Sequence, residues 1–348
     1  GKNWEVVTMK TLKVIVGLLI SLYLLGETRT LNVSLDGNHD YLSITEAMEY
    51  SLPGDTIFIF PGRYTKNTGE KFPLKIKSGI TLLGSNWETT IIDAEFKKSK
   101  AISISENINI ELNNLKIINS KIGVEARNEA DNLVIKHCYF SNLKETAIKI
   151  ENCSHPRITL NLITNNHQNG IILKNCQEVI LEKNTLVGQR AKNSIGVKIK
   201  KSDVTMRFNI INNFCQGIVL EKRLLTDLTI EYNNISQCVN IFQDPQTSQQ
   251  TMAFLFNKGN ITDDPLFINK EANNYHLKAN SPCLGWGALP DTSGKLLINL
   301  VNLPSFAYSA KYIAAKIPIG TAYKIAPATS KSVPIIAGKI PPSLPKSL

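Results

Sequence analysis

The sequence predicts an all-β fold in which the chain winds as a coil of short parallel strands, three to a turn. Three observations predict it: a unit of about 23 residues recurs, each unit holds three short apolar stretches, and an asparagine returns at one place in successive units. Strands stacked at roughly 4.8 Å in such a coil bury one continuous apolar core.

The first strand of each unit begins at a small residue, at Gly123, Ala147, Gly170, Gly196 and Gly217. Aliphatic residues stand at its second and fourth positions and mostly polar residues at its third and fifth, which is the period of a strand with one buried face. The third and fifth positions are therefore expected to form two outward columns: Glu125, Lys149, Ile172, Lys198 and Val219, and Arg127, Glu151, Lys174, Lys200 and Glu221.

The second strand carries a pair of apolar residues in each unit, namely Leu133 and Ile135, Ile158 and Leu160, Val179 and Leu181, Val204 and Met206, and Leu228 and Ile230. An asparagine follows it, at Asn161, Asn184, Asn209 and Asn233, with Cys138 at the matching place one unit earlier and Asn113 or Asn114 before that. Stacked amides hydrogen-bond along a column and tolerate the left-handed backbone of a tight turn. We therefore expect an asparagine ladder at a corner of the coil. The third apolar stretch comes two residues later, at Phe140, Ile163, Leu186, Ile211 and Ile235.

A helix is predicted before the first turns of the coil. Ser43 and Glu46 form a capping box, apolar residues from Ile44 to Leu52 fall at helical spacing, and Pro53 ends the pattern. The run from Ile57 to Phe60 has no polar face, which predicts a strand buried on both sides. Since an open coil end must be covered, we expect the helix to plug it and to bury this strand.

Three segments carry a resemblance to a known family. "SITEAMEYSLPGDTIFIFPGRYT" (43–65) resembles the amino-terminal cap of the pectate-lyase-like right-handed parallel β-helix superfamily, and "KFPLKIKSGITLLG" (71–84) resembles an uncharacterised bacterial branch of it. "DDPLFINKEANNYHLKANSPCLGWG" (263–287) is similar to the closing segment of those chains. The resemblance implies a right-handed three-strand solenoid with an N-terminal capping helix over residues 31–290. Members cleave, epimerise or de-esterify acidic polysaccharides, or only bind surfaces, so it implies a fold and no single activity.

The two ends of the chain have a different composition from the middle. In residues 1–30, Lys10 and Lys13 come directly before the apolar stretch from Val14 to Leu25, a pattern typical of a signal peptide, with a membrane anchor as the alternative. Residues 291–348 read as a Pro/Ala/Lys-rich linker or disordered tail. The leader predicts export, either secretion or a place in the cell envelope, in the periplasm or at the cell surface.

The net charge gives little support to a nucleic-acid-binding function. The formal charge is +10, but six lysines and no acid lie between Pro304 and Leu348, and the part between the two ends is nearly neutral. A basic total carried by the termini does not describe a binding surface. We therefore expect no nucleic-acid partner.

The outward columns of the first strand hold the candidate site. Their middle is basic, and the residues expected to bind substrate are Lys149, Glu151, Lys174, Lys198 and Lys200. The favoured function is non-catalytic binding of polysaccharide or another envelope component. The alternative is a metal-independent lyase on an acidic polysaccharide, with Lys198 or Lys200 as the base and Lys174 on the acidic sugar. No Asp occurs in these columns, which disfavours a calcium-dependent lyase, and no cofactor is predicted.

The positions of the histidines and cysteines in the repeat allow a few further predictions. His137, His155 and His167 occupy different places in the repeat, so no metal site is expected from them. Cys153 and Cys176, like Cys215 and Cys238, are 23 residues apart and are expected to stack on neighbouring turns, either as disulfides or as free thiols. Glu182, Arg207 and Glu231 form a further outward column, which we interpret as structural cross-strand pairing.

Overall fold

A computed structural model of the 348-residue chain describes residues 28–96, 99–221, 228–243 and 258–289. The chain divides into two compact units, Gly1–Gly294 and Lys295–Leu348, and every described residue belongs to the first. The predicted leader and tail fall almost wholly outside the described residues. Within those described ranges, no helix has the length and hydropathy that crossing a membrane requires.

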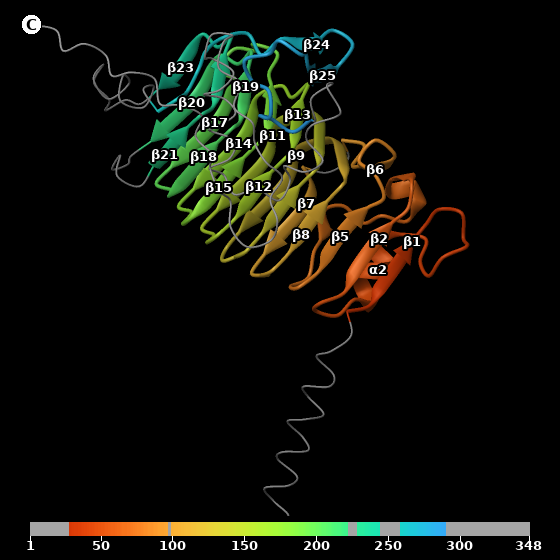
Figure 1. Ribbon diagram of the computed structural model, residues 1–348. Helices are drawn as coiled ribbons and strands as arrows, with labels where there is room; N and C mark the ends of the chain where they lie inside the picture. Colours follow the sequence, from red (N-terminus) through yellow and green to blue (C-terminus); the bar gives the residue numbers. More distant parts are fainter. Residues whose placement is uncertain (1–27, 97–98, 222–227, 244–257, 290–348) are drawn as a thin grey trace, which may run out of the picture. The chain divides into compact units, whose positions relative to one another are not determined.

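The first unit is a right-handed parallel β-solenoid, as predicted (Figure 1). The second strands of successive turns form one parallel sheet, nine-stranded among the described residues. Its strands, in spatial order, are β1 (Thr30–Val33), β2 (Thr56–Ile59), β5 (Thr81–Gly84), β8 (Glu111–Asn113), β10 (Val134–Lys136), β12 (Arg157–Thr159), β15 (Val179–Glu182), β18 (Val204–Arg207) and β21 (Leu228–Glu231).

The first and third strands share a second sheet, because the chain continues through one corner without a break in β9 (Lys116–Arg127) and β11 (Tyr139–Glu151). The other first strands are β4 (Leu74–Lys75), β7 (Lys100–Ser105), β14 (Asn169–Lys174), β17 (Ile195–Lys200), β20 (Gln216–Glu221) and β23 (Asn240–Gln243). The other third strands are β3 (Gly62–Tyr64), β6 (Thr90–Asp93), β13 (Leu162–Thr164), β16 (Thr185–Val187), β19 (Ile210–Asn212) and β22 (Asn234–Ser236).

The register confirms the predicted columns of the first and third strands. Val124, Ile148, Ile171, Val197 and Ile218 pair in sequence and are buried, and so are the third-strand residues from Phe140 to Ile235. One predicted second-strand pair is wrong. Ile158 pairs with Ile135, so Leu160 falls beyond the strand, half-buried, with a left-handed φ of 57°.

The asparagine ladder is present and fully buried. Each side-chain oxygen accepts a hydrogen bond from the backbone N–H of the ladder residue one turn earlier. The distance is 3.0 Å from Asn161 N to Asn184 Oδ1 and 2.9 Å from Asn184 N to Asn209 Oδ1. Each side-chain nitrogen donates to the next amide oxygen and to a strand carbonyl, such as Ile158 O for Asn184. The ladder extends past Asn233 to Asn260, which the repeat spacing did not identify. At its other end, Leu115 rather than Asn113 or Asn114 precedes Cys138.

The predicted reason for the ladder was partly wrong. The left-handed residue at this corner stands one place before each ladder position and belongs to many residue types. We call this file the corner column: Asn114, His137, Leu160, Lys183, Phe208, Tyr232 and Gly259. The ladder amides instead satisfy buried backbone groups, which would otherwise lack hydrogen-bond partners at the turn.

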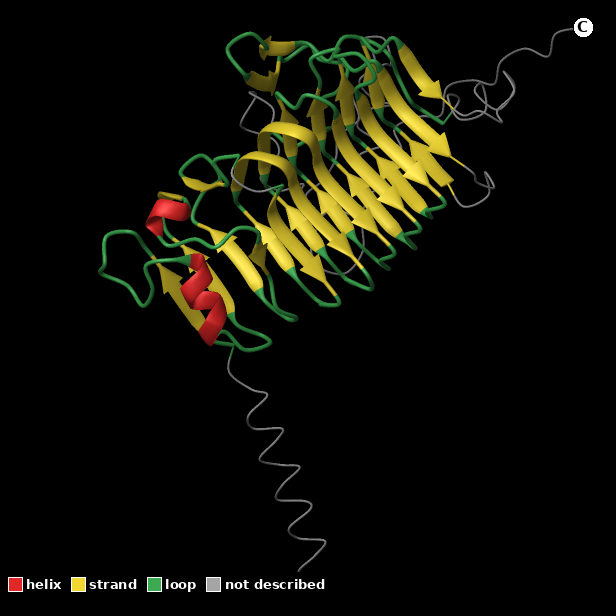
Figure 2. Cartoon of the chain, turned by 180° about the vertical axis from the view of Figure 1, so that it is seen from behind, coloured by secondary structure: helices red, strands yellow, loops and turns green. Residues whose placement is uncertain are grey.

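The N-terminal cap contains helix α2 (Ile44–Tyr50), followed by the short helix η1 (Lys66–Thr68). The Ser43 hydroxyl accepts from Glu46 N–H as predicted, but the Glu46 carboxylate accepts from Leu42 N–H instead of closing a capping box. Ile44, Ala47 and Met48 join the core, whereas Leu52 is 58% exposed. Helix α2 lies beside β1 and β2 at the end of the sheet (Figure 2).

The strand next to this helix is buried on one face, not on both as expected. Ile57 and Ile59 point into the core and are fully buried. Phe58 and Phe60 lie on the outer face, partly exposed, where their rings meet edge to face at 5.0 Å and His39 stacks on Phe60 at 3.9 Å. Aromatic packing along the surface therefore explains the apolar run that suggested a second buried face.

The segment that resembles a closing segment packs along the side of the coil. Its strands β24 (Phe267–Asn269) and β25 (Asn274–Leu277) pair antiparallel. Its hydrogen bonds reach three successive turns: Lys270 and Ala288 bond to Asn212 and Thr185 on third strands, and Asn273 bonds to Asn165, directly after β13. The outward residues of these strands, Leu162, Thr164, Thr185, Val187, Ile210 and Asn212, are consequently buried.

Candidate functional site

The predicted site residues lie together on the outward face of the first strands. We call this surface the first-strand wall, made of the outward residues of β7, β14, β17 and β20 and of the first-strand parts of β9 and β11 (residues 123–127 and 147–151). The register places Lys149 beside Ile172 and Ile172 beside Lys198. The next outward row runs through Glu151, Lys174, Lys200 and Glu221. All five predicted substrate-binding residues are therefore neighbours on adjacent rungs.

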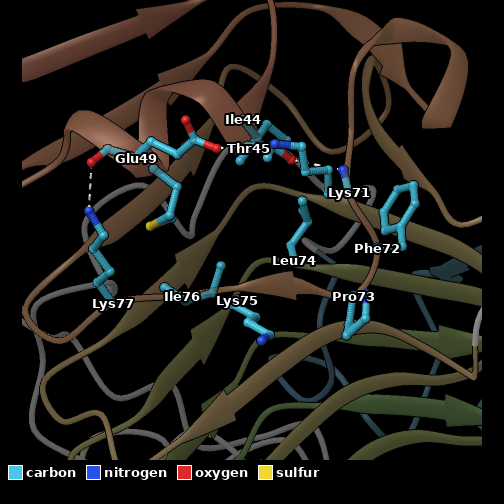
Figure 3. A pocket seen from close by; sticks show the side chains of 11 residues that line it. Ile44, Thr45, Glu49, Lys71, Phe72, Pro73, Leu74, Lys75, Ile76 and Lys77 are labelled. Carbon is cyan, nitrogen blue, oxygen red and sulfur yellow. Dashed lines mark hydrogen bonds and ion pairs between the residues drawn. The ribbon is translucent and has the colours of Figure 1, made fainter.

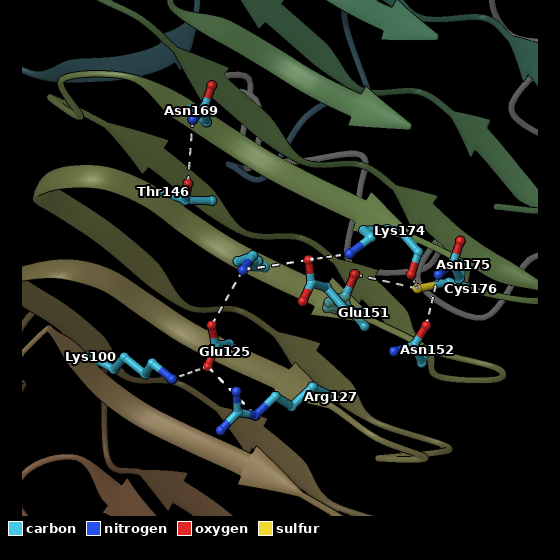
Figure 4. Close-up of polar contacts among 12 residues, drawn as sticks. Lys100, Glu125, Arg127, Thr146, Glu151, Asn152, Asn169, Lys174, Asn175 and Cys176 are labelled. Atoms are coloured by element: carbon cyan, nitrogen blue, oxygen red, sulfur yellow. Dashed lines mark hydrogen bonds and ion pairs between the residues drawn. The ribbon is translucent and has the colours of Figure 1, made fainter. Parts of the chain in front are cut away.

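Glu125 anchors the N-terminal part of the wall. Its side chain is almost completely buried, and its carboxylate meets Lys100, Lys149 at 3.5 Å and Arg127 at 4.0 Å (Figure 4). Burial alone would raise the pKa of Glu125, but these cations, Lys100 foremost, hold it below its ordinary value. The group is therefore a structural carboxylate that fixes three basic side chains.

Two further carboxylates are shared in the same way. Glu151 lies 3.5 Å from both Lys149 and Lys174 (Figure 4). Glu221 accepts from Lys198 at 2.7 Å and lies 3.5 Å from Lys200. The hydrogen bond from Lys198 is the main cause of the lowered pKa of Glu221.

Basic side chains outnumber carboxylates on the wall. Among its described ion pairs, six basic side chains (Lys100, Arg127, Lys149, Lys174, Lys198 and Lys200) face three carboxylates (Glu125, Glu151 and Glu221). Each carboxylate is shared by at least two cations, so a net positive charge remains along the stacked strands. Sequence reasoning had not assigned Lys100, Arg127, Glu125 or Glu221 to the site, although three of them stand in the two predicted outward columns.

The two candidate catalytic lysines share one carboxylate. Lys198 and Lys200 both contact Glu221. A general base must come within hydrogen-bond reach of the proton that it takes up, so either lysine would first have to leave Glu221.

The described residues hold no group of histidine, cysteine and acidic side chains that could bind a metal ion. The six cysteines are free thiols. Cys153 and Cys176 stack on neighbouring turns as expected, with Gln177 N–H donating to Cys153 O. Cys215, however, lies opposite Val239 rather than Cys238, because the register at this turn is one residue longer than the spacing suggested.

The outward column of Glu182, Arg207 and Glu231 forms on the second-strand sheet as predicted. Arg207 lies 3.4 Å from Glu231, which Lys258 approaches at 3.8 Å. These contacts join adjacent rungs and fit the structural interpretation of this column.

A pocket of about 470 Å³ lies between helix α2 and the segment that contains β4 (Figure 3). Its walls are mainly apolar, with Lys71, Lys75 and Lys77 at the rim. Lys71 pairs with Glu49 at 3.2 Å, and Lys77 donates to the carbonyls of Glu49 and Ser51. Two of the three rim lysines therefore hold the end of the helix in place. We interpret this pocket as a structural feature of the N-terminal cap.

Residues 32–265 match the family model described as "Protein of unknown function (DUF1565)". A comparison with curated protein sequences found no match.

Several solved structures are distantly similar to this chain. An alginate lyase from Paenibacillus sp. str. FPU-7 is 10% identical in sequence, with a TM-score of 0.37; the match covers 55% of this chain and 85% of the lyase chain. Pectin methylesterase PemA from Erwinia chrysanthemi is 15% identical over 60% and 70%, with a TM-score of 0.33. The A-module of the Azotobacter vinelandii mannuronan C-5 epimerase AlgE4 is 13% identical over 55% and 71%, with a TM-score of 0.31. Likeness this distant transfers neither activity nor substrate.

Proposed function

The chain belongs to the DUF1565 family, and we propose that it is an exported, non-catalytic β-helix protein that holds an anionic polysaccharide along its first-strand wall. Its place of work is outside the cytoplasm, in the cell envelope or beyond it. The ligand is a chain of uronate or sulfated sugars that runs across the stacked strands.

The observation that carries this proposal is the excess of cations on the wall. Six basic side chains share three carboxylates over strands β7 to β20, so the wall keeps unneutralised positive charge without one deep pocket. Rungs about 4.8 Å apart repeat this charge in a row, which suits a polymer with repeating negative groups. A polymer that contacts several rungs gains affinity from each of them.

The ion pairs also support binding over catalysis. An incoming carboxylate or sulfate can replace Glu151 or Glu221 beside the lysines without leaving any cation unpaired. The lyase alternative needs Lys198 or Lys200 within hydrogen-bond reach of the sugar, whereas both side chains contact Glu221 in the structure.

The test is a binding experiment with matched charge variants. Polygalacturonate, alginate and chondroitin sulfate are titrated against the protein and a Lys174→Gln, Lys198→Gln, Lys200→Gln variant. The control replaces Lys66, Lys192 and Lys278, which are exposed and lie outside the wall, and so makes the same change in net charge. We expect at least one polymer to bind, binding to weaken about tenfold or more in the wall variant and little in the control, and the affinity to fall with salt.

Two results would overturn the proposal. Equal loss of binding in the wall and control variants would show that only net charge matters. Unsaturated products absorbing in the ultraviolet, lost in Lys198→Gln, would establish the lyase alternative instead.

A further inference from the structure

A second pocket lies at the corner of the coil and shares no residue with the first-strand wall. We call it the corner pocket. It has a volume of about 220 Å³ and is lined by Ser85, Asn86, Trp87, Asn114, His137, Leu160, Ala288 and Leu289. These residues come from five separate parts of the chain, so the pocket exists only in the folded coil.

The floor of the corner pocket consists of three successive members of the corner column. Asn114, His137 and Leu160 are 23 residues apart, and each has a left-handed φ between 49° and 57°. A leucine in this conformation is strained where glycine would not be, yet Leu160 holds it and lines the pocket. The ladder residues Cys138 and Asn161, which follow immediately, hold the corner through buried hydrogen bonds.

One side of the pocket is a rigid turn that presents Trp87. The carbonyl of Asn86 accepts from Thr89 N–H at 3.1 Å and from Thr90 N–H at 2.8 Å, and its side chain accepts from Glu88 N–H. The indole of Trp87 packs against the ring of Tyr139 at 5.7 Å. Because the indole is already held in place, a ligand would not have to order it.

The other side comes from the end of the closing segment. Ala288 N–H donates to the hydroxyl of Thr185 at 2.9 Å, and Gly287 N–H donates to Phe208 O at 2.9 Å. The peptide that carries Ala288 and Leu289 is thereby fixed to the coil opposite the Trp87 turn. The pocket is preformed on both sides.

The lining combines one aromatic ring, two amides, a hydroxyl and an imidazole with apolar side chains. Amides and a neutral imidazole both donate and accept hydrogen bonds. None of the eight lining residues is acidic, lysine or arginine, so a charged ligand would lose water without gaining an ion pair. The volume lies below the roughly 300 Å³ at which pockets for drug-sized ligands begin, which leaves room for one small ring.

We propose that the corner pocket binds one ring of an uncharged sugar, with its C–H face on Trp87 and its hydroxyl groups on Asn86, Asn114 and His137. A sugar ring has an apolar face and a polar edge, which match the indole and the amides. This site differs from the wall in place and in charge, so each can exist without the other.

Isothermal titration calorimetry of the full chain tests the proposal, with cello-, xylo-, manno- and chito-oligosaccharides as probes and oligogalacturonate as the charged comparison. We expect at least one neutral probe to bind. Trp87→Ala should weaken that binding about tenfold or more, and Asn114→Gly, which keeps the left-handed backbone, should weaken it several-fold. Tyr50→Ala removes a 63% exposed ring that does not line the pocket and should leave binding unchanged.

Controls separate this site from the wall and from misfolding. Trp87→Phe keeps an aromatic ring and should retain part of the affinity, with a urea midpoint like that of the unaltered chain. The wall variant with Lys174, Lys198 and Lys200 replaced should bind the neutral probe normally. The proposal is overturned if no neutral probe binds, if Trp87→Ala binds as tightly as the unaltered chain, or if oligogalacturonate binds at Trp87 as well as the neutral probes do.

Discussion

Replacing Asn184 by alanine should cost about 3 kcal/mol of unfolding free energy, because it breaks the asparagine ladder at its centre. The buried Asn184 side chain accepts from the backbone N–H and the side-chain amide of Asn161, and donates to Ile158 O and to Asn209. Alanine leaves Asn161 N–H and Ile158 O without these partners. Each buried unsatisfied group costs about 1–3 kcal/mol.

Asn175→Gly is the matched control. Asn175 is also an asparagine at a corner of the coil, but it is exposed and has a left-handed φ of 52°, and its amide bonds to Asn152. Glycine accepts this conformation, so the change should stay within about 0.5 kcal/mol.

Urea unfolding and hydrogen exchange measure the two effects together. Asn184→Ala should lower the urea midpoint and increase exchange at Asn161 and its neighbours on the next turn, since a local break need not unfold the whole coil. Asn184→Ala and Asn175→Gly with equal stability and equal exchange would refute the ladder as a source of stability.

Three further changes follow from the described contacts. Glu221→Gln releases the ammonium of Lys198 and removes one negative charge from the wall, so an anionic polysaccharide should bind several-fold tighter; weaker binding would mean that the carboxylate contacts the ligand. Burial raises the pKa of Glu70, although its bonds to the first turn of α2 oppose this, so the folded chain holds the proton more tightly than the unfolded chain. The unfolding free energy of the unaltered chain, relative to Glu70→Gln, should therefore rise as the pH falls toward 4.5, and a flat or opposite trend would contradict this. Burial raises the pKa of Cys153 to about 12 and also raises that of Cys176, so both should react with iodoacetamide only after unfolding; rapid alkylation in the folded chain would contradict their burial.

The repeat made most of the coil predictable from the sequence. A parallel coil places residues one turn apart beside each other, so Lys149 and Lys198 could be assigned to one surface from their positions in the repeat. The same logic failed at two residues. Leu160 was aligned with Ile135, although the register at this turn places Ile158 there. Cys215 lies opposite Val239 because that turn is one residue longer than the spacing suggested.

The remaining features depend on contacts that a repeat does not encode. Lys100 precedes the recognised units, and its contact with Glu125 became visible only in the folded wall. The corner pocket needs the Trp87 turn and the end of the closing segment to meet across three rungs. One sequence signal could have identified this pocket: the residues one place before the ladder, Asn114, His137 and Leu160, recur in successive units.

Lysine footprinting shows whether the first-strand wall holds an anionic glycan. The chain is acetylated with and without polygalacturonate or whichever anionic polymer binds, and each lysine is quantified by mass spectrometry. We expect the polymer to protect Lys174, Lys198 and Lys200 and to leave Lys66, Lys192 and Lys278 as reactive as before. Equal protection of both sets, or protection confined to the second, would contradict it.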